Sequence, residues 1–361
     1  MAALAASDFG LKPLVIDENQ KPGGQLIKQT HMFFGSKAER AGTRGFDIGI
    51  ELAGEMEKRG IETWTNSPAV GYYPDGTPAC RNSCYGELLW RAGTVAVLRN
   101  GQLHGLKPKA VLAATGASEN FVTFPGSDLP GVYGAGAVQT LMNVYGIKPG
   151  QSVLMIGSGN IGLIVSYQLL QAGVKVKAVI EGLPNIGGYL VHASKIARAG
   201  VPVLTRHTIL EATGENQVTG AVISKIDDKW QPVKNSEQKI ECDTICLAVG
   251  LTPLTEILWQ AGCQMNFVPE LGGQVAWHDE LMMTSIPGIF TAGDVTGIEE
   301  ASTAMLEGEL AGLGAVKYLR GESKELQIRI DDTACRLAGL RAGPFGQKAR
   351  EGKCKLKECR R

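Results

Sequence analysis

The residues SVLMIGSGNIGLIVSYQLLQAGVKVKAVIE, 152–181, indicate most clearly how this chain folds. The apolar run from Val153 to Ile156 predicts a strand, which is followed by a glycine-rich turn, a helix to about Gln171 and a second strand ending at Glu181. Glycines spaced as G-x-G-x-x-G between a strand and a helix, with an acid at the end of the next strand, are typical of a dinucleotide-binding βαβ unit. We therefore expect a Rossmann-like domain built around this turn.

The residues of the turn suit contact with a phosphate. Gly157 allows the tight turn, Gly159 lets the backbone approach a pyrophosphate, and Gly162 lets the helix pack closely on the strand. Asn160 and Ile161 open the helix, whose free N–H groups and partial positive charge attract phosphates. These residues are our candidates for contact with the dinucleotide.

The acid Glu181 sets the coenzyme that we expect. It follows Gly157 by about 24 residues, close to the separation typical of dinucleotide-binding units. Its carboxylate would accept hydrogen bonds from the adenosine ribose diol. Because an acid rather than Arg stands here, NAD is favoured over NADP.

The composition is that of an ordinary globular protein. Its 361 residues are enough for two domains, and 36 Lys and Arg balance 36 Asp and Glu, so that no overall charge points to nucleic acid or an anionic membrane. The apolar run within residues 153–170 is interrupted by glycines and fits a buried βα unit better than a membrane span. The eight cysteines include no C-x-x-C pair, and the N-terminus lacks a basic signal region, so we expect a cytoplasmic protein.

The N-terminal residues look like the second half of another βαβ unit. Residues 1–9 resemble the end of an apolar helix, and Lys12 to Asp17 reads as a buried strand closed by an acid. When the two stretches are aligned so that Asp17 corresponds to Glu181, the positions that correspond to Gly157 and Gly162 fall before Met1. We therefore expect the first dinucleotide site to lack its opening strand and glycine turn, either because the start was placed late or because the chain is a fragment.

Five elements in the same order resemble the pyridine nucleotide–disulfide oxidoreductase superfamily of flavoproteins with two dinucleotide sites. Within it, PGGQL, LPGVYGAGAVQTLMN and GSGNIGL look most like the flavin subunits of amine and imino-acid dehydrogenases, such as sarcosine oxidase alpha, archaeal proline dehydrogenase alpha and hydrogen cyanide synthase. The five elements are Asp17 with the following Gly23-Gly24, Ala114-Thr115-Gly116, the turn at residues 157–162, Ala248-Val249-Gly250, and Thr291-Ala292-Gly293-Asp294.

The resemblance implies an α/β fold of two Rossmann-like dinucleotide-binding domains. Each would have three layers, two of β-sheet and one of helices (ββα), and one domain would be inserted in the other. The expected FAD domain comprises residues 1–118 and 251–321, and the NAD domain residues 119–250. A polar, basic tail spans 322–361. Since residues 346–361 hold seven Lys or Arg against two Glu, we expect the tail to be solvated and disordered.

The resemblance also implies which residues contact FAD. Asp17 would hold the adenosine ribose, the Gly23-Gly24 backbone would pass the ribityl chain and pyrophosphate, and Asp294 would bind a ribityl hydroxyl. The helix beginning near Ala301 would direct its positive end at the flavin N1/O2 edge. The remaining expected contacts are Gln25, Ala69, Thr115, Gly116 and Gly293.

The redox disulfide of many family members is absent from the two places where they carry it. The stretch that begins at the Gly23-Gly24 pair reads GGQLIKQTHMFFG. The stretch before the glycine turn at residues 157–162 reads VYGAGAVQTLMNVYGIKPGQ. Neither holds a cysteine, so electrons must pass directly between flavin, substrate, NAD or a partner. Gln25, Gln29 and His31 occupy the first stretch, either as proton donors or substrate contacts or as ordinary loop residues. No catalytic group or metal-ligand set stands out, and Cys354 with Cys359 is too small a set for a metal cluster.

We therefore expect an FAD-dependent, NAD-linked oxidoreductase, the flavin subunit of an amine or imino-acid dehydrogenase complex. A small-molecule substrate, an oligomeric state and a partner beta subunit belong to this expectation. One alternative is an NADH-driven reductase of a protein acceptor, and another is a nucleotide-binding subunit or fragment without catalysis. Since a missing first turn would remove the helix end that binds the FAD pyrophosphate, we expect weak flavin binding unless upstream residues are restored.

Overall fold

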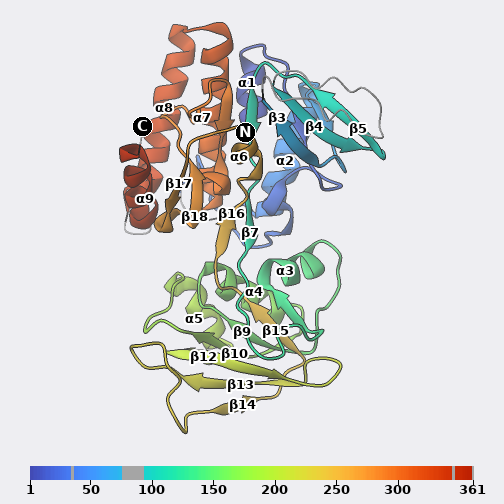
Figure 1. Ribbon diagram of the computed structural model, residues 1–361, viewed down its shortest axis with the longest axis vertical. Coiled ribbons are helices and arrows are strands. Elements are labelled where there is room, and N and C mark those ends of the chain that lie inside the picture. Colours follow the sequence, from blue (N-terminus) through green and yellow to red (C-terminus); the bar gives the residue numbers. More distant parts are fainter. Residues whose placement is uncertain (34–35, 75–92, 344–345, 360–361) are drawn as a thin grey trace. The chain divides into compact units, whose positions relative to one another are not determined.

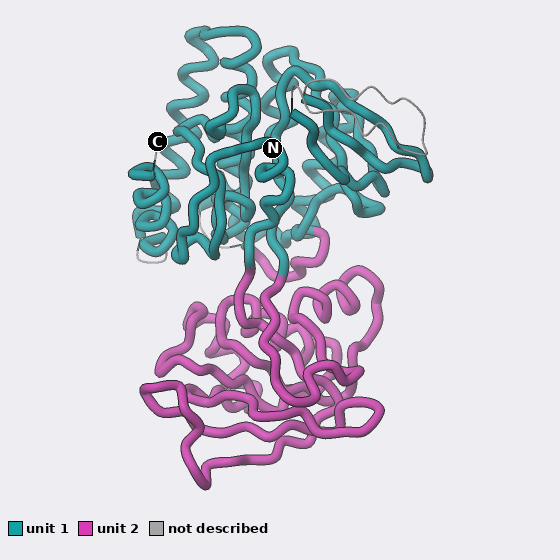
Figure 2. Tube along the Cα trace, in the orientation of Figure 1, with its two compact units in different colours: residues 1–26, 33–118, 252–361 teal, residues 27–32, 119–251 magenta. Residues whose placement is uncertain are grey.

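The computed structural model describes residues 1–33, 36–74, 93–343 and 346–359, which fall into two compact units. Unit 1 comprises residues 1–26, 33–118 and 252–361, and unit 2 comprises residues 27–32 and 119–251 (Figure 2). Most of unit 2 therefore lies in the chain between two parts of unit 1, as expected for one domain inserted in another. Two paired strands, β7 (Ala117–Glu119) and β16 (Leu251–Pro253), carry the chain between the units.

The centre of unit 2 is a parallel five-stranded sheet (Figure 1). Val153 and Met155 face one side of it and Leu154 and Ile156 the other, and all four are buried because both faces are covered. In spatial order the strands are β11 (Val203–Thr205), β10 (Lys175–Glu181), β9 (Ser152–Ile156), β15 (Thr244–Leu247) and β8 (Val132–Gly134).

Two different layers cover this sheet. Helices α3 (Ala135–Asn143), α4 (Asn160–Gln171) and α5 (Leu190–Arg198) share a core with the face that carries Val153 and Met155. An antiparallel sheet packs on the other face through Ile209 and Ile223. Its strands are β12 (His207–Thr213), β13 (Gly220–Lys225) and β14 (Gln238–Ile240). Unit 2 is thus a three-layer Rossmann-like domain, which confirms the expected fold class.

Unit 1 contains two short parallel strand pairs. One pair is β1 (Leu14–Ile16) with β2 (Glu62–Trp64), and the other is β6 (Val111–Ala113) with β19 (Ile289–Thr291). Helix α1 (Ala2–Asp8) leads into β1. In unit 2, by comparison, strand β9 lies within the five-stranded sheet and leads into the glycine turn.

The rest of unit 1 includes an antiparallel sheet of β3 (Ala69–Tyr73), β4 (Thr94–Arg99) and β5 (Gln102–Leu106). Asn100 and Gly101 form its hairpin turn with φ of 51° and 73°, as their residue types predict. Cys80 and Cys84 lie outside the described residues. The further elements are α2 (Gly45–Lys58), α6 (Glu256–Gln260), β17 (Met265–Val268), β18 (Gly273–Ala276), η1 (Gly24–Lys28), η2 (Pro269–Leu271) and η3 (Gly293–Thr296).

The C-terminal residues correct one expectation, because they are helical. Helix α7 (Ala301–Arg320) is followed by α8 (Lys324–Arg341) and α9 (Gln347–Glu358), so the expected disordered tail is wrong. Leu326, Ile330 and Leu337 of α8 enter the core formed with α7, and Leu356 of α9 packs against Leu271 and its neighbours. One apolar stripe is enough to fold a polar helix onto a core. Within the described ranges, no helix is long and apolar enough to cross a membrane.

Candidate dinucleotide sites

The glycine turn of unit 2 leaves one open approach for a ligand. A Cβ at Gly157 would lie 2.2 Å from the carbonyl oxygen of Ala248, and one at Gly162 would lie 2.1 Å from that of Gly157, so internal packing requires both glycines. A Cβ at Gly159 would meet no heavy atom of the described residues within 4 Å, its chain neighbours aside. The protein's own packing does not need a glycine there, whereas close approach of a pyrophosphate would.

Helix α4 begins directly at this opening. Its first intrahelical hydrogen bond runs from the N–H of Leu163 to the carbonyl of Gly159, at 3.0 Å. The N–H groups of Asn160, Ile161 and Gly162 precede that bond and belong to the helix end that attracts phosphates. The candidate residues of the turn are therefore brought together as expected for a dinucleotide site.

Glu181 braces the turn from the end of β10. One carboxylate oxygen accepts hydrogen bonds from the backbone N–H and the hydroxyl of Ser158, at 2.9 and 2.7 Å, and the other accepts the N–H of Leu183 at 2.9 Å. Since a carboxylate offers about four lone-pair positions, it keeps acceptor capacity for a ribose hydroxyl.

A segment that the sequence did not point to also contacts the turn. The N–H groups of Gly187 and Gly188 lie 3.3 and 2.9 Å from the hydroxyl and carbonyl oxygens of Ser158, and the N–H of Tyr189 lies 2.9 Å from the side-chain oxygen of Asn160. A Cβ at Gly188 would lie 2.9 Å from the backbone nitrogen of Asn160. The Gly187-Gly188 pair just before α5 is the sequence signal that could have revealed this close approach.

The candidate FAD residues of unit 1 follow strands β6 and β19. Ala113 is paired with Thr291, and the N–H of Ala292 donates to the carbonyl of Ala113 at 3.1 Å. Thr115-Gly116 and Gly293-Asp294 therefore leave neighbouring parallel strands at the same edge of the sheet, where α/β proteins bind ligands. A Cβ at Gly116 would likewise meet no described heavy atom within 4 Å beyond its chain neighbours, although its φ of +75° favours glycine.

Asp294 has an unusual environment for a carboxyl group. Burial raises its pKa to about 6, and the nearby carboxylates of Glu307, Glu299 and Glu300 act in the same direction. A half-buried carboxyl group with a raised pKa is suited to hydrogen bonding with a neutral hydroxyl such as that of a ribityl chain. Helix α7 begins seven residues later at Ala301, with its first intrahelical bond from the N–H of Ala304 to the carbonyl of Glu300.

The other candidate FAD contacts lie around the end of β1. Asp17 accepts hydrogen bonds from the backbone and side-chain N–H groups of Asn19, and its carbonyl accepts the N–H of Ser67, two residues before Ala69. Asp17 and Ala69 are thus brought to one edge of unit 1. Gly24 has a φ of +52° and open space where a Cβ would point, and the adjacent Gly23 has a φ of +132°. Gln25 is exposed in η1.

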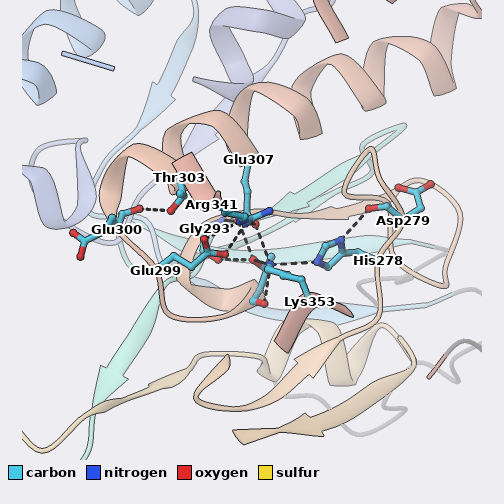
Figure 3. Close-up of polar contacts among 10 residues, drawn as sticks. His278, Asp279, Gly293, Glu299, Glu300, Thr303, Glu307, Arg341 and Lys353 are labelled. Atoms are coloured by element: carbon cyan, nitrogen blue, oxygen red, sulfur yellow. Dashed lines mark hydrogen bonds and ion pairs between the residues drawn. The ribbon is translucent and has the colours of Figure 1, made fainter. Parts of the chain in front are cut away.

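The structure also reveals polar residues behind the Gly293-Asp294 segment that the sequence did not point to. The N–H of Gly293 donates to the carboxylate of Glu307, which in turn pairs with Arg341 and Lys353 (Figure 3). No short motif announces them, because they come from three different helices. Their local signal is weak: Lys353 shares a helical face with Ala349 and Leu356, an unusual place for a lysine.

His31 lies in the short segment that belongs to unit 2. Its ring is 6.4 Å from that of His192, and burial, followed by the charges of His192 and Lys195, lowers its pKa to about 4. His31 is therefore neutral near pH 7. Among the described residues, no group of three or more His, Cys, Asp or Glu could hold a metal ion.

Comparison with known proteins identifies the family. The model of the family described as "Pyridine nucleotide-disulphide oxidoreductase" matches residues 1–308. This chain belongs to that family. The family consists of FAD-dependent oxidoreductases, so the resemblance read from the five sequence elements is confirmed.

Curated relatives cover most of the chain. One subunit of the opine oxidase of Rhizobium meliloti (strain 1021) is 26% identical over 356 residues, which cover 92% of this chain and 72% of that protein. Hydrogen cyanide synthase subunit HcnB of Pseudomonas aeruginosa is 27% identical over 345 residues, 86% of this chain and 67% of that protein. The corresponding opine oxidase chain of Agrobacterium tumefaciens (strain Ach5) is 27% identical, with 88% of this chain and 63% of that protein covered. The chain spans about two thirds of the length of these relatives.

Solved structures share the fold. Thioredoxin reductase of T. acidophilum superposes with a TM-score of 0.67 at 20% identity, covering 87% of this chain and 92% of that one. L-Proline dehydrogenase of P. horikoshii gives a TM-score of 0.64 at 20% identity, covering 92% of this chain and 56% of that one. At this identity the likeness shows the two-domain Rossmann-like fold alone.

Proposed function

We propose that this chain is the flavin subunit of an FAD-dependent, NAD-linked oxidoreductase that oxidises a small amine or imino acid without a redox disulfide. The observation that carries the proposal is the set of described cysteines. Cys242, Cys246 and Cys263 are buried, and burial raises the pKa of each thiol, which disfavours the reactive thiolate. The other described cysteines, Cys335, Cys354 and Cys359, are exposed among the C-terminal residues. None of these six lies in η1 or in the segment that leads into β9.

The names of the relatives support the substrate class and the partner. One chain of an opine oxidase and one of a hydrogen cyanide synthase are similar to nearly the whole of this chain. The first is named for the oxidation of an opine, and the second for the formation of hydrogen cyanide, a compound in which carbon is bonded to nitrogen. Both relatives are named as subunits, which favours a second chain beside this one.

The residues of unit 1 fit the ribityl side of FAD. The open positions at Gly24 and Gly116 would let the cofactor approach the backbone, and Asp294 would accept a hydrogen bond from a ribityl hydroxyl. The N-terminus of α7 would favour negative charge beside it. When bound, the flavin would take up a hydride from the carbon next to the substrate nitrogen.

The residues of unit 2 would hold the second dinucleotide. The N-terminus of α4 would face the NAD pyrophosphate at the opening above Gly159, and Glu181 would accept the adenosine ribose diol. Because neither of the two places where family members carry a redox disulfide holds a cysteine, the electrons would pass directly between flavin and NAD or to the partner subunit.

An anaerobic reduction experiment tests this proposal. The FAD-loaded protein, with its partner subunit where one co-purifies, is mixed with proline, sarcosine, an opine or NADH, and the visible flavin absorbance is followed. We expect bleaching by at least one of the amines and by NADH. Full bleaching by NADH with no response to any amine would instead identify the second candidate function.

That second candidate is an NADH-driven reductase of a protein acceptor. The intact glycine turn of unit 2 favours it, because this turn is the most completely formed ligand site in the described residues. Failure of both NADH and the amines to reduce bound flavin, or failure to bind flavin at all, would contradict both candidates and favour a nucleotide-binding subunit without catalysis.

A further inference from the structure

A buried ion cluster lies directly behind the Gly293–Thr296 segment (Figure 3). At its centre is Glu307 of α7, whose exposed fraction is only 2%. One carboxylate oxygen lies 2.9 Å from both the N–H of Gly293 and the hydroxyl of Thr296. Glu307 therefore holds the start of the segment that contains Asp294. The cluster also comprises His278, Glu299, Arg341 and Lys353.

The positive charges of the cluster come from the two C-terminal helices. The second oxygen of Glu307 lies 2.6 Å from Nη2 of Arg341, at the end of α8, and 2.9 Å from Nζ of Lys353 in α9. Arg341 also forms a bidentate pair with Glu299 at 2.6 and 2.9 Å. Although burial opposes its ionisation, Lys353 and Arg341 hold the pKa of Glu307 well below its usual value.

The ammonium group of Lys353 is buried and hydrogen-bonded within this cluster. Its exposed fraction is 8%, and its ammonium donates to the carbonyl and the hydroxyl of Thr296, at 3.0 and 2.7 Å, as well as to Glu307. It also lies 3.4 Å from Nε2 of His278. Nδ1 of that ring faces the carbonyl of Asp279 at 3.0 Å and must donate to it, so Nε2 is left as an acceptor for Lys353.

We propose that Lys353 and Arg341 are positioning residues for the candidate FAD-binding segment Gly293–Thr296. Arg341 acts through Glu307, and Lys353 acts through both Glu307 and Thr296. The proposal rests on the proposed function, because contact between this segment and FAD belongs to it. A buried carboxylate without its cations would be strongly disfavoured, so the hydrogen bond to Gly293 depends on helices α8 and α9. The folded C-terminal residues thereby support the candidate cofactor site through the ion cluster.

The test compares Lys353→Met with Lys355→Met. Lys355 lies on the same helix, but it is exposed and pairs with Glu270 at the surface, so its replacement is a matched control. Two readouts are used: hydrogen exchange of the Gly293 amide in the flavin-free protein, and FAD affinity from quenching of flavin fluorescence. We expect Lys353→Met to speed the exchange by about tenfold or more and to weaken FAD binding on the order of ten- to a hundredfold, and Lys355→Met to change neither.

A double variant protects the test against simple unfolding. Glu307→Gln combined with Lys353→Met leaves no unpaired carboxylate, because Arg341 stays paired with Glu299, and the amide oxygen can still accept the N–H of Gly293. Since the amide NH2 group then faces Arg341 in place of an acceptor oxygen, we expect the double variant to regain part of the Gly293 protection that Lys353→Met loses. Unchanged Gly293 exchange and FAD affinity in Lys353→Met, or a double variant as impaired as the single one, would overturn the proposal.

The two readouts separate this inference from the proposed function. If the wild-type chain binds no FAD, the proposed function fails, whereas hydrogen exchange at Gly293 still shows whether Lys353 positions the segment. If FAD binds and the hydrogen exchange of the Gly293 amide is the same in Lys353→Met as in the wild type, only the positioning role fails.

Discussion

The carboxylate of Glu181 accepts hydrogen bonds from both the backbone N–H and the hydroxyl of Ser158, at 2.9 and 2.7 Å. The acid that would recognise the ribose therefore also holds the glycine turn that would bind the pyrophosphate. Changes at Glu181 should alter coenzyme choice and turn geometry together, and a substitution that keeps an acceptor is needed to separate the two effects.

Glu181→Gln makes that separation. The glutamine oxygen can still accept the N–H and the hydroxyl of Ser158, and only the bond from the N–H of Leu183 is given up. The negative charge that would repel the 2′-phosphate of NADPH is lost. We expect the preference for NADH over NADPH to shrink by about tenfold, measured as the ratio of their dissociation constants. Glu211→Gln, an exposed change on β12, should leave the ratio unchanged. An unaltered ratio in Glu181→Gln would show that Glu181 does not face the ribose.

Gly159→Ala tests the opening of the turn. The space around a Cβ at Gly159 is open, so the variant should keep the wild-type unfolding midpoint in urea while its NADH affinity falls by about tenfold or more. Gly162→Ala is the contrasting variant, because its Cβ would lie 2.1 Å from the carbonyl of Gly157 and should destabilise unit 2. Wild-type NADH affinity in Gly159→Ala would place the pyrophosphate elsewhere.

Asp294→Asn should stabilise the flavin-free protein in a pH-dependent way. The pKa of Asp294 is raised from 3.8 to about 6, so the folded state binds this proton more tightly than the unfolded state does. The free energy of unfolding of the wild type therefore falls as the pH rises from 3.8 to about 6, and the full loss is present above pH 6. We expect the variant to gain about 2 kcal/mol near pH 7.5, nothing near pH 4, and to bind FAD about tenfold more weakly.

Urea unfolding curves at several pH values measure this difference. If Asp294→Asn raised the free energy of unfolding equally near pH 4 and near pH 7.5, ionisation of Asp294 would not be the cause. FAD affinity equal to that of the wild type would remove Asp294 from the cofactor site.

Leu356→Ala tests whether the C-terminal helix is part of the fold. Leu356 is 1% exposed and packs with Leu271, Val275 and Trp277. Its truncation should cost roughly 2–4 kcal/mol of unfolding free energy in urea. Cys354→Ala, an exposed change on the same helix, should cost little. Equal stability of the two variants would restore the picture of a solvated tail.

The sequence predicted unit 2 well because its signals are local. The strand β9, the turn at Gly157 and the acid at Glu181 lie within thirty consecutive residues and follow one backbone pattern. The contact of Gly188 with Asn160 could not be read from that pattern, because it depends on how the loop after β10 returns to the turn.

The C-terminal helices were missed for a physical reason. In α8 the buried residues Leu326, Ile330, Thr333 and Leu337 recur at helical spacing, but charged residues surround them and lower the mean hydropathy. In α9 the buried face includes Lys353, which a count of charges assigns to solvent. Only the tertiary contact with Glu307 shows that this charge is paired.

Anaerobic reductive titration of the FAD-loaded protein with dithionite is the sharpest test of electron transfer without a disulfide. A flavin without a redox disulfide takes up about two electrons before it is fully reduced, whereas a flavin coupled to a disulfide takes up about four. We predict about two electrons per flavin, with NADH able to deliver them. Uptake of about four electrons, or a protein that retains no flavin to titrate, would contradict the proposed function.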